Sequence, residues 1–315
     1  MDVVSIERNT SISKHKGLSG SLKKRGYTLS ETLAGYLYLT PVFLWVLIFM
    51  LFPMGYVIYL SFYKWNFVSS EKHFVGLGNY VSLLHDPEFL GSLNHTFEFT
   101  VVSVLVTIVM SLIIALLLNQ QIKGIGILRS IFYSPVVVSM IAAAMVWSFL
   151  YDPQYGSINN ILHIMGISGP HWLDDPHWAL ISIVIMTVWK NMGYYAVIYL
   201  AALQGISNSY YEAAALDGAN RWKVFRFITW PLLMPATLLI AVMGIINSFQ
   251  VFGQIYVMTQ GGPVGSTNVI VYYLYEKAFQ FFEMGYASAV GFVLFIIIFV
   301  ITLVQFKYVD RKMDF

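Results

Sequence analysis

ASAVGFVLFIIIFVITLVQF, residues 287–306, is an apolar run without a single charged side chain. A helix needs roughly 20 such residues to cross a hydrocarbon core of about 30 Å, so this run predicts a membrane-spanning helix. Five other windows meet the same requirement. We place the six spans near residues 35–62, 97–118, 131–150, 178–200, 233–257 and 287–306.

The composition of the whole chain agrees with a polytopic membrane protein. Hydrophobic residues make up 58% of the 315 residues, charged residues 11%, and the mean hydropathy is +0.69, which together exclude a soluble domain. A transmembrane barrel would show short alternating segments, whereas these runs are continuous. The predicted fold class is therefore all-α, with a membrane domain over residues 35–308.

Basic residues are distributed unevenly between the two sides of the predicted membrane domain. Loops rich in Lys and Arg stay in the cytoplasm, so the bias predicts that both termini are cytoplasmic, as a basic tail over residues 1–34 and a short tail over residues 309–315. The first thirty residues are polar and basic, which predicts a signal anchor rather than a cleavable signal peptide. Inner segments would hold Arg8, Lys14, Lys16, Lys23, Lys24, Arg25, Lys123, Arg129, Arg221, Lys223, Arg226, Lys307, Arg311 and Lys312, and outer ones Lys64, Lys72 and Lys277.

A polar segment interrupts the apolar runs between the fourth and fifth spans. It reads YEAAALDGANRWKVFRFITWPLLMP over residues 211–235. Ser209 and Glu212 fit a capping box, in which each side chain satisfies a free backbone amide of the other, so a short helix is predicted to start there. Gly218 would end it, because glycine tolerates the conformation that closes a helix.

A second short helix is predicted beyond this glycine. It would run from Asn220 or Arg221 to about Thr229, and Pro231 and Pro235 would then mark the entry into the fifth span. Residues 205–232 are thus expected to form a cytoplasmic two-helix loop. Such a knob could fit into a groove of another protein.

The spacing within this loop resembles that of a known family. Glu212-Ala-Ala, three residues, Gly218, nine residues and then Ile-x-x-Pro231 is similar to the EAA loop of permease subunits in binding-protein-dependent ABC importers, with Trp230 where Leu is usual. FVGLGNY at 74–80, LQGI at 203–206 and TQGGPVGST at 259–267 also resemble the carbohydrate-uptake branch, of the maltose and glycerol-3-phosphate permease type. The resemblance covers nearly the whole chain after residue 30.

The resemblance implies a machine made of several chains in a bacterial or archaeal plasma membrane. This chain would pair with a second homologous permease, two copies of an ABC ATPase would bind and hydrolyse ATP with Mg, and an extracytoplasmic solute-binding protein would deliver the substrate. No nucleic acid partner is expected. The implied ATPase-coupling residues are Glu212, Ala213, Ala214, Asp217 and Gly218, and the alternative is that Glu212 is only a cap and Gly218 only a turn.

Lys190 is the most unusual residue within the predicted spans. A charge at that depth costs about 2.5–3.5 kcal/mol on insertion scales, so the side chain should face protein or a water-filled cavity. Two roles stay open. The ammonium group contacts substrate hydroxyls or a phosphate, or it is a structural charge that snorkels or bonds helix-end carbonyls of a neighbouring span.

Other polar residues of the fourth and fifth spans are candidates for a substrate site. Polar groups beside aromatic faces suit sugars, and the resemblance places sugar-lining side chains on these same two helices. The alternative is hydrogen bonding between helices, the usual role of Asn, Gln or Ser in a membrane helix. The predicted substrate-binding residues are Lys190, Asn191, Tyr194, Asn247, Phe249 and Gln250.

Catalytic, nucleotide-binding and metal motifs are missing from the sequence. There is no GxxxxGK[ST] phosphate loop and no HExxH pair, so neither an enzyme activity, a bound cofactor nor a metal is predicted for this chain. An ion-coupled secondary transporter would carry carboxylates or histidines within its spans, and it is the remote alternative.

Residues 259–286 are predicted to form an outer segment rather than a seventh span, since Glu276, Lys277 and Glu283 interrupt its apolar run. The substrate stays open between a sugar or oligosaccharide and glycerol-3-phosphate or another polyol phosphate.

Overall fold

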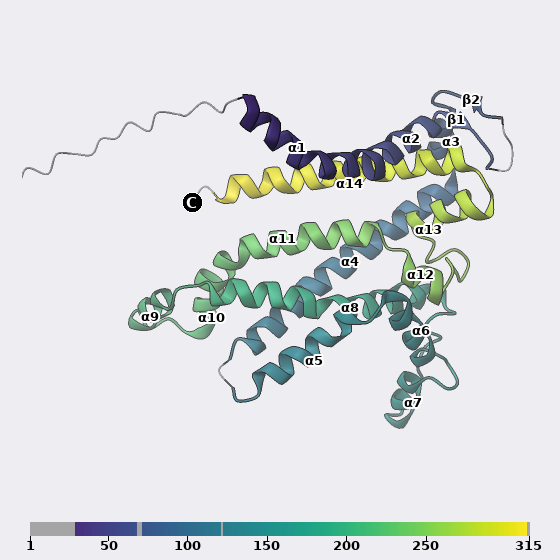
Figure 1. Cartoon of the computed structure of the whole chain (residues 1–315). Coiled ribbons are helices and arrows are strands. Elements are labelled where there is room, and N and C mark those ends of the chain that lie inside the picture. Colours follow the sequence, from purple (N-terminus) through teal and green to yellow (C-terminus); the bar gives the residue numbers. More distant parts are fainter. Residues whose placement is uncertain (1–28, 68–70, 121, 314–315) are drawn as a thin grey trace, which may run out of the picture. The chain divides into compact units, whose positions relative to one another are not determined.

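The computed structural model describes residues 29–67, 71–120 and 122–313 (Figure 1). The chain divides into two compact units, Met1–Pro53 and Met54–Phe315, which are described separately. The described residues are mostly helical, and their two strands hold two residues each. Five helices are long and apolar enough to cross a membrane, and a bent helix pair makes a sixth candidate. The prediction of an all-α polytopic membrane protein is confirmed.

The first unit is dominated by one helix. Helix α1 (Leu29–Val46) runs into a π-helical turn (Leu47–Leu51), and the first candidate span covers Tyr36–Leu60, ending with α2 (Phe52–Leu60). Residues 1–28 of the predicted N-terminal tail lie outside the described residues. The last six residues of that predicted tail are helical instead, because Leu, Glu and Ala at these positions favour a helix.

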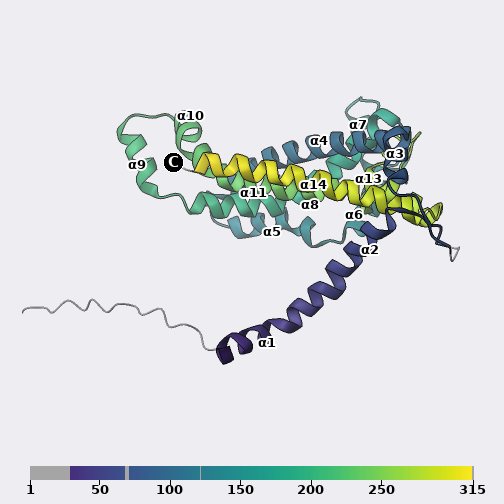
Figure 2. The same cartoon turned by 90° about the horizontal axis from the view of Figure 1, so that it is seen from above.

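The second unit is built around long helices that lie side by side. They are α4 (Pro87–Leu118), α8 (Pro176–Gln204), α11 (Trp230–Phe249) and α14 (Met284–Met313); their axes are roughly aligned in Figure 2, and α4 is inclined to the others in Figure 1. Helix α4 packs most extensively on α8, and α11 packs on α4, α8 and α14. Helix α14 extends to Met313 and so includes most of the predicted C-terminal tail.

The third predicted span, residues 131–150, is not one straight helix. It consists of α5 (Ile125–Val137) and α6 (Met140–Leu150), which meet at an angle of 99°. Pro135 lies in the last full turn of α5, Val138 is extended, and Ser139 caps α6 by accepting a hydrogen bond from the Ala142 amide at 3.2 Å. The chain therefore leaves one helix and starts another inside the apolar window.

The fifth span also differs from its prediction. Helix α10 (Arg221–Val224), a π-helical turn (Phe225–Thr229) and α11 form one continuous helix from Arg221 to Phe249, so the second loop helix is not separate from the span. The wider π-helical turn ends two residues before Pro231 and lets the helix continue past a residue without an N–H. The span ends at Phe249 rather than residue 257, and α12 (Gly253–Met258) follows as a short helix of its own.

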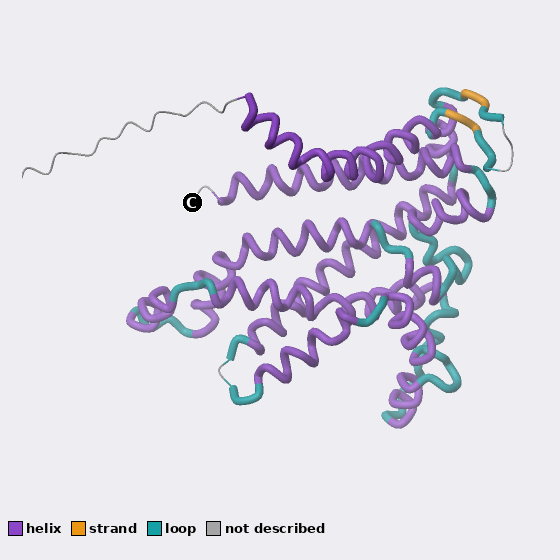
Figure 3. The backbone as a smooth tube through the Cα atoms, in the orientation of Figure 1, coloured by secondary structure: helices purple, strands orange, loops and turns teal. Residues whose placement is uncertain are grey.

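The shorter elements gather at the two ends of the second unit. Helix α9 (Asn208–Leu216) and α10 lie at one end, here called the α9 end (Figure 1). The opposite end, called the α3 end, holds α3 (Gly78–His85), α13 (Ile270–Tyr275) with its π-helical extension (Glu276–Gln280), and an antiparallel hairpin (Figure 3). The hairpin pairs β1 (Tyr63–Lys64) with β2 (His73–Phe74). Helix α7 (Ser157–Ile164) follows α6.

Candidate functional site

A polar cavity of about 280 Å³ lies among α4, α8, α11, α12 and the start of α6. This volume is near the lower end of the range for small-molecule sites, which runs from about 300 to 1,000 Å³. Its wall carries hydroxyl groups, amide groups and aromatic rings. The lining residues are Phe99, Ser103, Val104, Thr107, Ile108, Met140, Thr187, Asn191, Tyr195, Ile240, Gly244, Asn247, Ser248, Gln250, Val251, Phe252, Gly253 and Gln254.

Three of the six predicted substrate-binding residues lie on this wall, namely Asn191, Asn247 and Gln250. The other three do not line the cavity. Tyr194 is exposed on another face of α8, and Phe249 is buried in an apolar cluster with Ile270 and Tyr273. Lys190 is described below.

The cavity face of α8 is offset by one residue from the predicted face. Residues spaced by four share a face of a helix, and Thr187, Asn191 and Tyr195 form that stripe. The prediction instead grouped Asn191 with Tyr194. In the sequence, the polar groups spaced by four residues are the signal that marks the cavity face of α8.

Hydrogen bonds on the cavity wall also connect neighbouring helices. Asn247 Nδ2 donates to the Tyr195 hydroxyl at 3.3 Å, and Gln254 Nε2 donates to Thr187 Oγ1 at the same distance. The hydroxyl groups of Ser103 and Ser248 lie 3.2 Å apart. These hydrogen bonds therefore hold the helices of the wall together. The donors and lone pairs that they leave unused can still form hydrogen bonds with a bound molecule.

Lys190 points away from the cavity and toward the end of α5. Only 7% of the residue is exposed, and its Nζ donates hydrogen bonds to the Pro135 and Val136 carbonyl oxygens at 2.9 and 3.0 Å. In this structure two helix-end carbonyls of a neighbouring element accept the hydrogen bonds of the ammonium group.

Helix α9 holds most of the predicted coupling residues. Its N-cap is Ser207, whose hydroxyl accepts a hydrogen bond from the Ser209 amide at 3.4 Å. The predicted capping box between Ser209 and Glu212 is therefore wrong. Ser209 lies inside the first turn, and its hydroxyl lies 2.8 Å from that of Ser207. Glu212 is exposed.

The turn after α9 has the geometry that glycine was expected to provide. Gly218 has a φ of +67°, the Gly218 amide bonds the Ala215 carbonyl at 3.1 Å, and the Ala219 amide bonds the Ala214 carbonyl at 2.9 Å. This bond pair is the Schellman arrangement, which ends a helix on a left-handed residue. Ala214 is buried, whereas Ala213 and Asp217 are exposed.

Apolar side chains project from the α9 end. Leu216 is 90% exposed, Trp222 67% and Phe227 71%, and a groove of about 340 Å³ lies between α9 and α10. Asp217 and Lys223 are among the residues that line this groove. Large exposed apolar groups beside polar ones are typical of a protein-binding surface.

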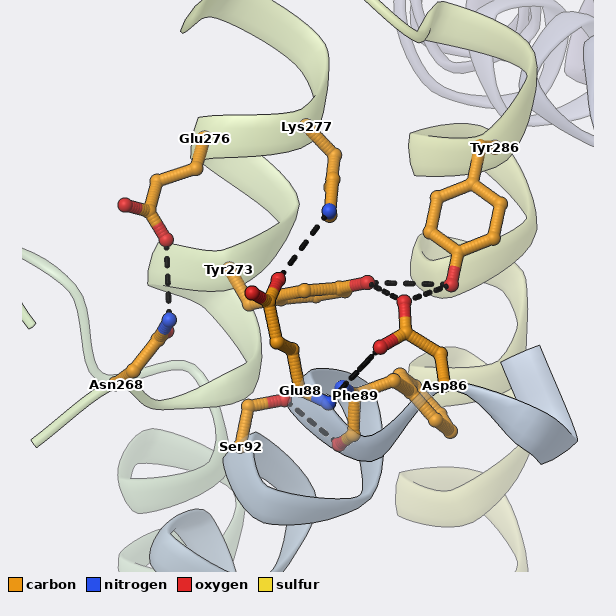
Figure 4. Close-up of polar contacts among 9 residues, drawn as sticks. All are labelled: Asp86, Glu88, Phe89, Ser92, Asn268, Tyr273, Glu276, Lys277 and Tyr286. Atoms are coloured by element: carbon orange, nitrogen blue, oxygen red, sulfur yellow. Dashed lines mark hydrogen bonds and ion pairs between the residues drawn. The ribbon is translucent and has the colours of Figure 1, made fainter. Parts of the chain in front are cut away.

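The α3 end carries a cluster of polar contacts, which we call the Asp86 cluster (Figure 4). The Asp86 carboxylate accepts hydrogen bonds from the hydroxyls of Tyr273 at 2.5 Å and Tyr286 at 2.7 Å. Its other oxygen caps α4 by accepting from the amides of Glu88 and Phe89. Partial burial alone would raise the pKa of Asp86, but these hydrogen bonds outweigh it and lower the pKa below its ordinary value. The cluster joins α4, α13 and α14.

Three further contacts extend this cluster. Lys277 Nζ lies 3.3 Å from Glu88 Oε2 and 5.1 Å from the Tyr273 ring centroid. Asn268 Nδ2 donates to Glu276 Oε2 at 3.1 Å, and burial raises the pKa of Glu276. Among the described residues, no group of three or more His, Cys, Asp or Glu side chains could hold a metal ion.

Helices that can cross a membrane, arranged around a cavity with polar groups on its wall, define a polytopic membrane protein. Comparison with known proteins identifies the family. Residues 108–315 match the model of the "Binding-protein-dependent transport system inner membrane component", and the chain belongs to this family.

The chain is similar over most of its length to characterised members. It is 36% identical over 293 residues to the trehalose/maltose transport system permease protein MalF of Thermococcus litoralis, covering 92% of this chain and 96% of that one. It is 31% identical over 281 residues to the sn-glycerol-3-phosphate permease UgpA of Agrobacterium fabrum, with 89% and 96% covered. A chain in the crystal structure of a bacterial alginate ABC transporter, solved with a pentasaccharide-bound periplasmic protein, matches with a TM-score of 0.79, 25% identity, and 90% and 96% coverage.

Proposed function

We propose that this chain is the permease subunit of an ATP-driven importer and forms half of the pathway for an uncharged sugar or oligosaccharide. The relatives transport trehalose and maltose, glycerol-3-phosphate or alginate, so family membership alone leaves the charge of the substrate open. The cavity of this chain supports the choice.

The observation that carries the proposal is the chemistry of the cavity wall. The described residues that line it offer hydroxyls, amides and aromatic rings but no Asp, Glu, Lys, Arg or His. Sugars present hydroxyls at their edges and apolar C–H faces, which match amides such as Asn191 and rings such as Phe252. A phosphate would need a charged donor, and buried phosphates are usually met by Arg or Lys.

Lys190 does not supply that donor. Its ammonium group already bonds two carbonyls at the end of α5 and lies outside the cavity wall. The transport of glycerol-3-phosphate or another polyol phosphate is therefore the less favoured alternative for this chain.

The surface at the α9 end supports a role in coupling to an ATPase. Exposed Leu216, Trp222 and Phe227 give it an apolar contact area, and the Schellman turn at Gly218 gives α9 a defined orientation. In the proposed machine two copies of an ABC ATPase, with ATP and Mg, bind beneath this chain and a second homologous permease. An extracytoplasmic binding protein docks at the α3 end, and both termini are cytoplasmic.

The substrate assignment is tested by uptake into proteoliposomes that hold the complete transporter and its binding protein. Asn191→Leu, on the cavity wall, should reduce sugar uptake at least about tenfold, because a lost hydrogen bond to substrate leaves polar groups unpaired. Tyr194→Leu, three residues away on another face of α8, is the matched control and should stay near wild type. Equal effects of the two variants, or uptake of a phosphorylated substrate in preference to neutral sugars, would contradict the proposal.

The coupling assignment has its own test. Gly218→Pro cannot adopt a φ of +67°, so the turn after α9 has to change. ATP hydrolysis should then no longer drive uptake, while the protein still reaches the membrane. Uptake at the wild-type rate with the ATPase still bound would show that this turn has no coupling role.

A further inference from the structure

The end of α5 creates an unusual demand for hydrogen-bond donors. The last four carbonyls of any α-helix have no partner within it, and inside a membrane water cannot replace one. At the end of α5 the chain turns through 99° into α6, and Val138 is extended. The Pro135 and Val136 carbonyls therefore need a donor from another element.

Lys190 of α8 supplies that donor. Its Nζ bonds both carbonyls, at 2.9 and 3.0 Å, and the residue is 7% exposed. A positive charge at the C-terminal end of a helix is also favoured by the helix dipole. The free-energy cost of placing a lysine at this depth is thus offset by its hydrogen bonds at the break between α5 and α6.

One turn further along α8, the two helices touch through their backbones. A Cβ added to Gly193 would lie 1.9 Å from the Phe132 carbonyl oxygen, a distance at which the α5 backbone has to move. Lys190 and Gly193 are three residues apart and so lie on the same face of α8. Two consecutive turns of α8 therefore hold the last two turns of α5.

The element after the break contributes to the cavity. Met140, the first residue of α6, lines the wall. A Cβ added to Gly253 of α12, also on the wall, would lie 3.6 Å from Met140 Cγ and 3.5 Å from Ile141 Cδ1, so the start of α6 packs closely on α12. The direction in which α6 leaves the break therefore decides where this part of the wall lies.

We propose that Lys190 is a positioning residue that fixes the bend between α5 and α6 onto α8 and thereby sets the α6 side of the transport cavity. Substrate is not its ligand. Because α8 ends at Gln204, four residues before α9 begins at Asn208, the contact also ties the broken span to the helix that leads to the ATPase-coupling loop. Only this link to coupling rests on the proposed function.

The bend can be measured directly, because the chain contains no cysteine. Ile127→Cys on α5 and Phe149→Cys on α6 are both exposed positions for a pair of spin labels in the assembled transporter. We expect Lys190→Met to shift or broaden the distance distribution and Lys190→Arg, which keeps charged donors, to restore it. Tyr199→Phe is the matched control, because it removes another buried hydrogen bond of α8, to Thr237 at 3.0 Å, far from the break.

Uptake kinetics separate positioning from substrate contact. We expect Lys190→Met to lower the maximal uptake rate about tenfold, the equivalent of one hydrogen bond to a charged group, and to change the half-saturating sugar concentration only together with the bend, because Met140 on the wall moves with α6. A substrate contact would instead raise that concentration and leave the bend intact.

An unchanged distance distribution in Lys190→Met would overturn the proposal whatever the uptake assay shows. If Lys190→Met does not assemble, Lys190→Arg decides. Assembly with the wild-type distribution supports the role of charged donors, and failure to assemble contradicts it. A wild-type transporter that imports no sugar would refute the proposed substrate but leave the spin-label result standing.

Discussion

Replacing Asp86 by alanine should destabilise the α3 end much more than the loss of a helix cap alone. The side chain caps α4, and losing an N-cap costs about 1 kcal/mol. It also accepts hydrogen bonds from the hydroxyls of Tyr273 and Tyr286, and bonds to a charged group contribute about 1.5–3 kcal/mol each. Because Asp86 is only partly buried, we take the lower value for both. The expected loss is about 4 kcal/mol.

The chain contains a matched control for this variant. Asp175, like Asp86, precedes a proline and caps a long helix, accepting a hydrogen bond from the His177 amide at 2.9 Å, but no tyrosine hydrogen bond to it is found among the described residues. Asp175→Ala should therefore cost only about 1 kcal/mol. In thermal unfolding of the purified transporter, Asp86→Ala should lower Tm by about 8 °C and Asp175→Ala by about 2 °C.

A double-mutant cycle isolates the phenol contacts. In a Tyr273→Phe/Tyr286→Phe background, Asp86→Ala should cost no more than the cap, about 1 kcal/mol. If Asp86→Ala lowers Tm equally with and without the two hydroxyls, or if Asp86→Ala and Asp175→Ala have the same effect, the hydrogen bonds of the Asp86 cluster contribute nothing and our reasoning is wrong.

Three further predictions concern other parts of the molecule. Gly193→Ala should prevent assembly or abolish uptake, because its Cβ would lie 1.9 Å from the Phe132 carbonyl oxygen, whereas Gly91→Ala, with nothing within 4 Å, should be neutral in gel filtration and uptake. Leu216→Asp should reduce co-purification of the ATPase, since it puts a charge on a side chain that is 90% exposed at the proposed interface. Because the pKa of Asp86 is lowered in the folded state, its stabilisation should persist above a pH of about 4 and be lost as pH falls further, measured as Tm against pH relative to Asp86→Ala.

Most of the helical architecture could be predicted from the sequence, because apolar length is a strong signal. What hydropathy could not show is where a window breaks. Residues 131–150 contain no charged side chain and are mostly apolar, yet Pro135 and the cap at Ser139 divide them into two helices at 99°. At Pro231 the reverse holds: a proline was expected to separate two helices, but a π-helical turn lets one helix continue. Both outcomes depend on whether the neighbouring turns and helices provide hydrogen-bond partners for the backbone groups that a break or a proline leaves unpaired.

The residues that line the cavity were harder to predict than the fold. The predicted substrate-binding residues lie on the same two helices as part of the cavity wall, but the face of a helix depends on register, and a shift of one residue rotates it by about 100°. Lys190 drew the prediction toward its own face because a buried charge suggests a ligand. Its partners are two backbone carbonyls, which carry no signature in a sequence. Thr187, Gln254 and Ser103 are ordinary polar residues whose meeting at one cavity depends on tertiary packing.

Helix α8 brings the separate parts of this structure together. Its 29 residues extend over about 44 Å, with the cavity stripe of Thr187 and Tyr195 on one face and the contact of Lys190 with α5 on another. Its last turn leads within four residues to α9. A movement of α9 imposed by an ATPase would therefore pass through residues 205–207 to α8, the helix that carries both part of the cavity wall and the contact with the broken span. Weakening the Lys190 contact should then separate the broken span from that movement while the cavity stripe of α8 still follows it, so uptake should slow.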